Sequence, residues 1–365
     1  MAVTMTTAHL NRIATAVPEF DVHLPFVGFA KEMLQDERTR GLFSRMARVS
    51  GISRRYSVLN PDVLGQEGSI DAAKFYMRGS FPSTAARMRV FEQSAPGLAR
   101  TTVDRLALSA EERARVTHVI MTSCTGLYAP GLDFEIMDYL GLAETVERTT
   151  IGFMGCYAAM NALKVARHIV RSEPEAAVLV VNLELCTLHL QETQELEQVL
   201  SFLVFSDGCA ASLVTADATG LALDSFRSVV IPKTRDLITW KIGELGFDML
   251  LSGRVPGEIA RALRSASRET GAREITGGRA VDEIDLWAVH PGGRSVLDAV
   301  EDGLELREGS LLASRQILEC FGNMSSATVM FVLEQVMRGA AAGQSGCAMS
   351  FGPGLTAETL LFHVA

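Results

Sequence analysis

The sequence has no paired cysteine motif, no long hydrophobic run and no excess of positive charge. None of its six cysteines belongs to a C-x-x-C pair, so the zinc and dithiol sites that such pairs build are not expected. No apolar stretch approaches the length of a membrane span, and the N-terminal region lacks the apolar core of a signal peptide. The formal net charge of −9 argues against a general nucleic-acid binder. We therefore expect a cytoplasmic protein with reduced thiols, no membrane span and no nucleic-acid partner.

The composition is that of a large folded protein. With 365 residues and 48% hydrophobic residues, the chain can form two domains or two fused halves. The first 110 residues or so read as mostly helical and charged, with a basic island at 43–56 that is either a solvated helix face or the mouth of a site for a phosphorylated ligand. Buried strands then alternate with helices, which predicts an α/β protein with a largely buried sheet. The predicted strands cover residues 116–124, 176–181, 209–214 and 284–290.

Cys156 lies where a glycine-containing segment meets a helix-forming run. Gly152 and Gly155 precede it, and small residues lead into the predicted helix at 162–170. At a helix N-terminus the free N–H groups and the macrodipole favour a thiolate, so Cys156 is a candidate nucleophile. The alternative is a small apolar residue that packs a buried helix, as most free cysteines do.

The second half of the chain repeats the pattern of the first. A buried strand ends at Cys124 in one half and at His290 in the other, and a glycine followed by a polar residue opens a helix at Cys156 and at Asn323. The spacings agree, since 156 − 124 = 32 and 323 − 290 = 33. We therefore predict two similar α/β halves, residues 1–219 with the cysteine and 220–365 with the histidine and asparagine.

This duplication would bring three distant residues together. Two helix N-termini would carry Cys156 and Asn323 on either side of a pseudo-twofold axis, with His290 beside them at the end of its strand. The strings at 208–212 and 346–350 also resemble each other and are interpreted as equivalent parts of the repeat. Chance similarity between short strings rich in glycine and alanine is the alternative.

A cysteine, a histidine and an asparagine can together support acyl-transfer chemistry. An imidazole within reach of Cys156 would raise its thiolate fraction, and the Asn323 amide can hold an oxyanion without ionising. Donors from His290 and Asn323 on one thioester carbonyl would suit decarboxylation of a malonyl thioester and condensation of the enolate with an acyl group on Cys156. A papain-like hydrolase uses the same residue types, but there the asparagine orients the histidine.

Four segments together resemble the type III polyketide synthases, relatives of chalcone synthase in the thiolase superfamily. They are residues 155–156, 290–293, 322–327 and 351–358, and the resemblance extends from about residue 18 to the end of the chain. It implies a five-layer αβαβα homodimer without a cofactor that uses malonyl-CoA and an acyl-CoA starter directly. By the same likeness Cys156 holds the starter, while His290 and Asn323 drive decarboxylation and stabilise the condensation. The chain would then be extended iteratively, cyclised to a pyrone, resorcinol or phloroglucinol type of product, and released.

The resemblance also implies roles for residues around the site. Phe205 and Met249 match two gatekeeper positions, with Phe247 as the alternative for the second. Arg45 matches a residue that binds CoA phosphates, and Arg48 would supply a second cation. Cavity-lining positions are Cys124, Thr125, Cys186, His189, Trp240 and Ser325, together with Gly352, Pro353 and Gly354 of a glycine-rich loop. Trp240 replaces a glycine of the plant enzymes, which implies a bacterial-type relative.

Three other functions compete with this interpretation. A ketoacyl synthase III-like enzyme would perform one condensation and take malonyl from a carrier protein. A catalytically idle thiolase-fold scaffold would form no acyl-enzyme, and a cysteine hydrolase would cleave thioesters without malonyl-CoA. The segment at 290–293 and Phe205 favour the polyketide synthase.

Overall fold

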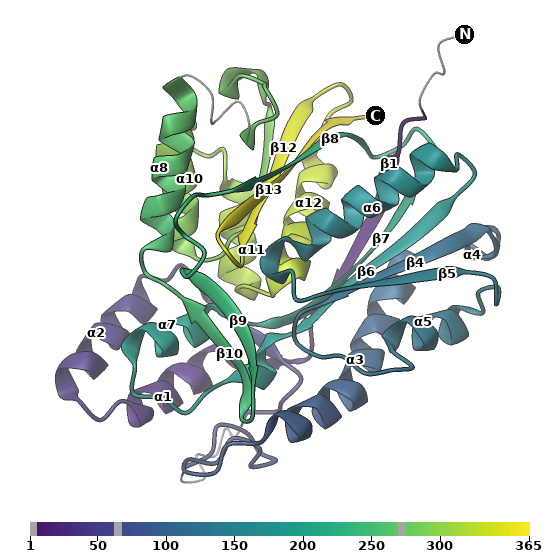
Figure 1. Ribbon diagram of the computed structural model, residues 1–365. Helices are drawn as coiled ribbons and strands as arrows, with labels where there is room; N and C mark the ends of the chain where they lie inside the picture. Colours follow the sequence, from purple (N-terminus) through teal and green to yellow (C-terminus); the bar gives the residue numbers. More distant parts are fainter. Residues whose placement is uncertain (1–5, 62–67, 269–274) are drawn as a thin grey trace.

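A nine-stranded mixed sheet runs through the protein in the computed structural model, which describes residues 6–61, 68–268 and 275–365 (Figure 1). The strand order is β11-β12-β13-β8-β1-β7-β6-β4-β5. The strands are β1 (His9–Ala16), β4 (Val116–Ser123), β5 (Glu147–Gly152), β6 (Ala177–Leu185), β7 (Asp207–Thr215), β8 (Leu221–Val230), β11 (Leu286–Val289), β12 (Ser345–Gly352) and β13 (Thr356–Val364). Only two residue pairs join β1 to β8, so the sheet divides into a half of five strands and a half of four.

The two halves of the sheet have the same topology. In the first half, β4 pairs in parallel with β6, and the antiparallel partners β7 and β1 follow. In the second half, β11 pairs in parallel with β12, and the antiparallel partners β13 and β8 follow. Within the described residues, only β5 has no counterpart. The predicted α/β fold of two duplicated halves is therefore confirmed.

One part of the predicted repeat is wrong. Residues 208–212 lie in β7 and residues 346–350 lie in β12, but the topology pairs β7 with β13 and β6 with β12. The likeness reflects close packing, because small residues are needed at each place for different neighbours. A Cβ on Gly208 would approach the Met324 sulfur to 2.3 Å, and one on Gly346 would approach the Phe362 ring to 2.1 Å.

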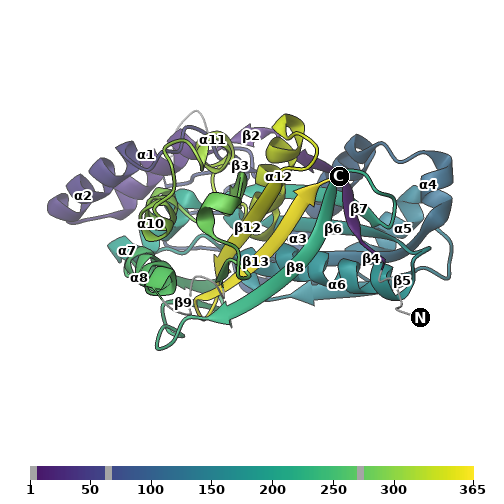
Figure 2. The ribbon, with the colours of Figure 1, turned by 90° about the horizontal axis from the view of Figure 1, so that it is seen from above.

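The protein has five layers: the two halves of the sheet, a layer of helices between them, and a layer of helices outside each half. The central layer is α6 (Ala158–Ser172) and α12 (Thr328–Gly339), which share one hydrophobic core with both halves of the sheet. Outside the first half lie α3 (Thr84–Leu106) and α5 (Leu132–Leu140), and outside the second lie α8 (Val255–Arg268) and α10 (Arg294–Leu304). Seen from above, the α4–α5 and α8–α10 ends lie at opposite sides (Figure 2). The resulting αβαβα arrangement is the one that the resemblance implies.

The remaining elements cover the end of the sheet near the site. Helices α1 (His23–Met33), α2 (Glu37–Arg48) and α7 (Leu196–Val204) gather there with the hairpin of β9 (Ile238–Gly243) and β10 (Gly246–Leu251) (Figure 1). The other elements are β2 (Phe20–Asp21), β3 (Tyr56–Ser57), α4 (Ala110–Arg115), α11 (Leu312–Phe321) and the 3₁₀ turns Gly155–Tyr157, Cys186–His189, Val281–Glu283 and Ser325–Ala327. In the described part of the chain, no helix combines the length and apolarity that crossing a membrane requires.

Candidate active site

The two helices of the central layer open in the same way. Gly155 precedes Cys156 and has φ +67°, and Gly322 precedes Asn323 and has φ +69°. Both backbones lie in the left-handed region, where glycine is favoured because it has no Cβ. A 3₁₀ turn then leads into α6 after Gly155, and another leads into α12 just after Asn323. The repeat therefore sets Cys156 and Asn323 at the starts of two adjacent central helices.

Cys156 is held between the end of β4 and the β12–β13 hairpin. The Gly155 N–H donates to the Cys124 sulfur at 3.0 Å. A Cβ on Gly155 would come within 2.3 Å of Pro353 Cδ, so the hairpin packs directly on this turn. The position of Cys156 therefore depends on both halves of the protein.

The amide of Asn323 has a fixed orientation. Its Oδ1 accepts hydrogen bonds from the Ser325 N–H at 2.9 Å and from the Thr328 hydroxyl at 3.5 Å. Its Nδ2 donates to the Gly292 carbonyl at 3.3 Å. Because the oxygen is occupied, the second Nδ2 proton is the part of this amide that remains for a ligand.

His290 follows the last residue of β11, and its backbone N–H donates to the Met349 carbonyl at 2.7 Å. The side chain is buried, and neither ring nitrogen has a hydrogen-bond partner among the described residues. Burial lowers the pKa of His290 to about 3, so the ring is neutral at physiological pH. A neutral imidazole keeps one N–H donor and one acceptor nitrogen for a ligand.

One cavity of about 640 Å³ brings these residues together. Besides Cys156, His290 and Asn323, seven of the predicted positions line it: Cys124, Phe205, Trp240, Met249, Ser325, Gly352 and Pro353. Of the two candidates for the second gatekeeper, Met249 is therefore the one that lines the cavity. Phe247 instead stacks on His189, with 4.1 Å between the ring centroids.

Four of the predicted cavity residues lie outside this lining. His189 is a buried hydrogen-bonded side chain, since its Nε2 donates to the Thr125 carbonyl at 2.6 Å and its Nδ1 accepts from the Phe247 N–H at 3.1 Å. Thr125 directs its hydroxyl to Glu184 at 2.9 Å. Cys186 packs against Phe205 and Met249 behind the cavity wall. Gly354 forms the turn of the hairpin, at φ +73°.

Burial opposes the thiolate that the sequence predicts at Cys156. It raises the pKa of the thiol to about 12, although hydrogen bonds from Ser325 and Asn323 partly offset it, and the Glu184 carboxylate raises the pKa further. The neutral His290 supplies no positive charge to compensate. In the substrate-free site, burial therefore favours the thiol and the neutral imidazole and opposes the predicted thiolate–imidazolium pair.

Comparison with known proteins identifies this site's family. The models for the chalcone and stilbene synthases match residues 6–218 with the N-terminal domain and 222–365 with the C-terminal domain. The chain belongs to this family. It is an enzyme, a type III polyketide synthase.

Similar proteins come from plants, bacteria and algae. Bisdemethoxycurcumin synthase of Oryza sativa subsp. japonica is 32% identical, over 88% of this chain and 82% of the relative. The alpha-pyrone synthesis polyketide synthase-like Pks18 of Mycobacterium tuberculosis is 31% identical, over 98% and 92%. The structure of PKS-I from the brown alga Ectocarpus siliculosus superposes with a TM-score of 0.88 at 28% identity, and each chain is covered fully.

Sequence reasoning missed Glu184 in this synthase. Its carboxylate lies under the site and accepts from the Cys124 N–H and the Thr125 hydroxyl, both at 2.9 Å, and from the Ser326 hydroxyl at 2.6 Å. Burial raises its pKa to about 7. An acidic residue inside an otherwise apolar strand, at the end of β6, was the available signal, because such a group is rarely buried without a role.

The predicted CoA-binding cations of the synthase lie on α2. Arg48 lines an open depression of about 840 Å³ together with Arg294 and Arg315. Arg45 is exposed on the same helix but outside that lining. Carboxylates of Asp298 and Glu301 pair with Arg315, and Arg294 Nε lies 3.7 Å from Asp298, so Arg48 is the more available cation. Arg294 was not predicted, although it directly follows the segment at 290–293.

Proposed function

We propose that this synthase transfers an acyl group from an acyl-CoA starter to Cys156 and extends it by repeated decarboxylative condensation with malonyl-CoA. The observation that carries the proposal is that Cys156, His290 and Asn323 line one largely apolar cavity. Among the described residues the His290 ring has no hydrogen-bond partner, and the Asn323 amide, which interacts with the Cys156 thiol, offers its second N–H to a ligand. In this proposal the CoA thioesters are substrates, and no bound cofactor takes part.

Loading begins from the neutral thiol. As the Cys156 sulfur attacks the thioester carbonyl, its proton passes to the acceptor nitrogen of His290. The bond between the acyl carbon and the CoA sulfur then breaks, and the leaving thiolate takes that proton. The low pKa of His290 favours its rapid return to the neutral form.

Extension uses the same donors a second time. Loss of CO₂ from malonyl-CoA leaves the electron pair of the broken C–C bond as an enolate, whose oxygen accepts from Asn323 Nδ2 and the N–H of His290. The enolate carbon attacks the acyl carbonyl on Cys156, and the carbon–sulfur bond to the enzyme breaks. The Cys156 thiolate that leaves takes up a proton from water and returns to the thiol. The product is a β-ketoacyl-CoA that can load again. Neutral donors suit both steps because they stabilise the oxyanion without protonating it.

The name of one relative guides the choice of product. Pks18 is named for alpha-pyrone synthesis, and its similarity covers 98% of this chain. A pyrone is therefore the first product to look for, with resorcinol and phloroglucinol types as the other outcomes. The aromatic group of His189, Trp240 and Phe247 lies beside the cavity and would restrict the folding of a long intermediate.

The proposed active form is a homodimer. Strand β5 is one edge of the sheet, and residues 147–150 along it are exposed. An exposed edge offers unpaired backbone groups to a second copy of the chain. The apolar side chains of Leu127, Phe134 and Tyr139 are also exposed on the segment that precedes β5 and would be covered with it.

The test is an incubation of the purified protein with malonyl-CoA and acyl-CoA starters from acetyl to long chains, with products identified by mass spectrometry. Products with two or more extensions in the absence of carrier protein are expected. A single extension that requires malonyl-carrier protein would instead support the ketoacyl synthase alternative. Hydrolysis of the starter without malonyl-CoA consumption would support the hydrolase.

A further inference from the structure

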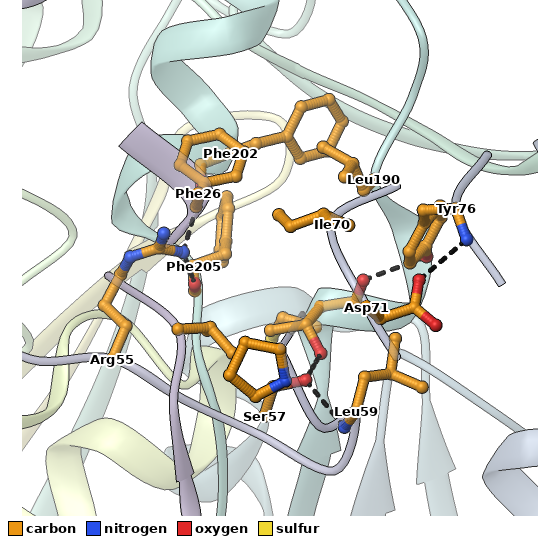
Figure 3. A pocket seen from close by; sticks show the side chains of 14 residues that line it. Phe26, Arg55, Ser57, Leu59, Ile70, Asp71, Tyr76, Leu190, Phe202 and Phe205 are labelled. Atoms are coloured by element: carbon orange, nitrogen blue, oxygen red, sulfur yellow. Dashed lines mark hydrogen bonds between the residues drawn. The ribbon is translucent and has the colours of Figure 1, made fainter. Parts of the chain in front are cut away.

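A second cavity lies behind Phe205. Its empty space is about 460 Å³, part of it open to solvent, and Phe205 lines both this cavity and the catalytic one. Its walls come from α1, β3, residues 59–61 and 70–76, the Cys186–His189 turn and α7 (Figure 3). We call it the side cavity. Its lining is Val22, Phe26, Arg55, Ser57, Leu59, Pro61, Ile70, Asp71, Tyr76, Cys186, Thr187, Leu190, Phe202 and Phe205.

Most of this lining is apolar, but Arg55 adds an unused hydrogen-bond donor. Arg55 is 2% exposed, and its guanidinium lies 4.7 Å from the centre of the Phe26 ring. Nη1 donates to the carbonyls of Phe202 at 3.1 Å and Phe205 at 2.6 Å, and Nε donates to the His23 ring at 3.2 Å. Among the described residues, Nη2 has no partner. A buried donor without a partner is costly, which points to a ligand atom that accepts from it.

The surrounding charges favour a neutral acceptor. The carboxylates of Asp21 and Asp207 interact with Arg55 and already offset its charge. Asp71 adds another carboxylate to the wall, where it accepts from the N–H groups of Phe75 and Tyr76, both at 2.8 Å. A ligand carboxylate would be repelled by these groups, whereas a ketone or hydroxyl oxygen needs only the free N–H.

Phe205 lies between the two cavities, since its side chain lines both. Its backbone is held, because its carbonyl accepts from Arg55 and the next N–H, of Ser206, donates to the Asn323 carbonyl at 2.9 Å. Its ring packs with Cys186 and Met249, which are soft and adaptable neighbours. Because Phe205 lines both cavities, rotation of its side chain is the movement that our inference requires to join the side cavity to the site of Cys156.

We propose that the side cavity receives the distal end of an acyl chain carried on Cys156, and that Arg55 Nη2 donates to a neutral oxygen on that end. The ligand class is an apolar acyl chain of medium length, with a keto or hydroxyl group near its far end preferred. This inference rests on the proposed acyl-enzyme at Cys156 and adds to it where the chain goes.

Ile70 provides the test, because it lines the side cavity but not the catalytic cavity (Figure 3) and belongs to no helix or strand. Ile70→Trp fills the cavity, Ile70→Val is the matched control, and Leu59→Trp fills it from another wall if the first variant does not fold. The measurement is the rate of Cys156 acylation by acyl-CoAs from acetyl to dodecanoyl, read by intact-protein mass spectrometry without malonyl-CoA. Ile70→Trp should load acetyl normally and lose about tenfold or more of its rate for the longest starters. The same chain-length profile in wild type, Ile70→Trp and Leu59→Trp would overturn the proposal.

A second arm tests the oxygen. Two starters of equal length, one with a keto group near the far end, are compared in the wild type and in Ile70→Trp. The wild type should prefer the oxygenated starter by about three- to tenfold, and Ile70→Trp should not. Equal rates for the two starters in the wild type would remove Arg55 from the proposal. If the acylation rate depends on the length of the acyl chain as expected but no chain is extended with malonyl-CoA, the proposed function is contradicted. The inference about the side cavity is then still supported.

Discussion

At Cys156 and His290, burial determines the resting protonation state. A helix N-terminus favours a thiolate, but withdrawal from water acts more strongly and leaves the thiol and a neutral imidazole. Both shifts oppose charge separation before substrate arrives, so the proposed mechanism starts from the thiol and moves its proton to His290 as the thioester is attacked.

Substitutions at two of these residues should separate the two steps of the proposed mechanism. Asn323→Ala removes a donor to the enolate oxygen, so CO₂ release from malonyl-CoA should fall by about 10²- to 10³-fold. Cys156→Ala leaves both donors in place and should retain malonyl-CoA decarboxylation while abolishing chain extension. CO₂ release at the wild-type rate in Asn323→Ala would contradict the enolate role, and unchanged product formation in Cys156→Ala would remove the nucleophile.

Glu184 should make the stability of the protein depend on pH. Its pKa of about 7 in the folded protein exceeds the ordinary value of 4.5, so the folded state binds this proton more tightly than the unfolded state does. The contribution of Glu184 to the free energy of unfolding is fully present below pH 4.5 and is lost as the pH rises through about 7. The loss should amount to about 3 kcal/mol.

Glu184→Gln is the variant that tests this dependence. Its amide can still accept from the Cys124 N–H and the Thr125 hydroxyl, and it can donate to the Ser326 hydroxyl. Urea unfolding from pH 4.5 to 8, at one protein concentration, should show a smaller fall in unfolding free energy for Glu184→Gln than for the wild type. Parallel curves for the two proteins would contradict the raised pKa.

At the scale of elements, the site is built where four connections meet. The turns that open α6 and α12 carry Cys156 and Asn323, β11 ends at His290, and the β12–β13 hairpin packs on the first turn. Each of these connections is short, so a shift of one is transmitted to the others.

Gly155→Ala should show this coupling. Gly141, which ends α5, has a similar φ of +63° but nothing within 4 Å of an added Cβ, whereas at Gly155 Pro353 would lie at 2.3 Å. Gly141→Ala should therefore cost about 1–2 kcal/mol of stability through backbone strain alone and leave Cys156 acylation unchanged. Gly155→Ala should displace the hairpin and slow acylation by about tenfold or more. Equal acylation rates in the two variants would contradict the coupling.

The sequence allowed these elements to be predicted where the local pattern was strong. The strands that end at Cys124 and His290 and the helices after Cys156 and Asn323 occur as expected, because buried strands and glycine turns leave clear local signals. The neutral state of the thiol, the outward displacement of His189 from the cavity and the role of Glu184 were not predictable. These three properties depend on how far segments distant in the sequence exclude water from the site. The spacing of residues along the chain does not show this.

At the scale of the whole molecule, the duplication leaves one strand without a counterpart. Four strands of the first half match four of the second in the described residues, and β5 is the additional one, at the sheet's edge. An unpaired exposed edge favours association, and a twofold axis beside it would place β5 of two copies side by side. The resulting sheet would be continuous across a homodimer.

Like charges placed on this edge should break the proposed dimer. Thr149 and Thr150 are exposed on β5, and in a twofold arrangement lysines there would lie close to the lysines of the second copy. The double variant Thr149→Lys, Thr150→Lys should weaken the dimer by about 10²-fold or more, because juxtaposed like charges cost several kcal/mol. Light scattering after size exclusion should then give a monomer mass at concentrations where the wild type is a dimer. Ser228→Lys, on the exposed part of β8, adds charge elsewhere and should remain dimeric. A dimer that survives both lysines on β5 would place the interface on another surface.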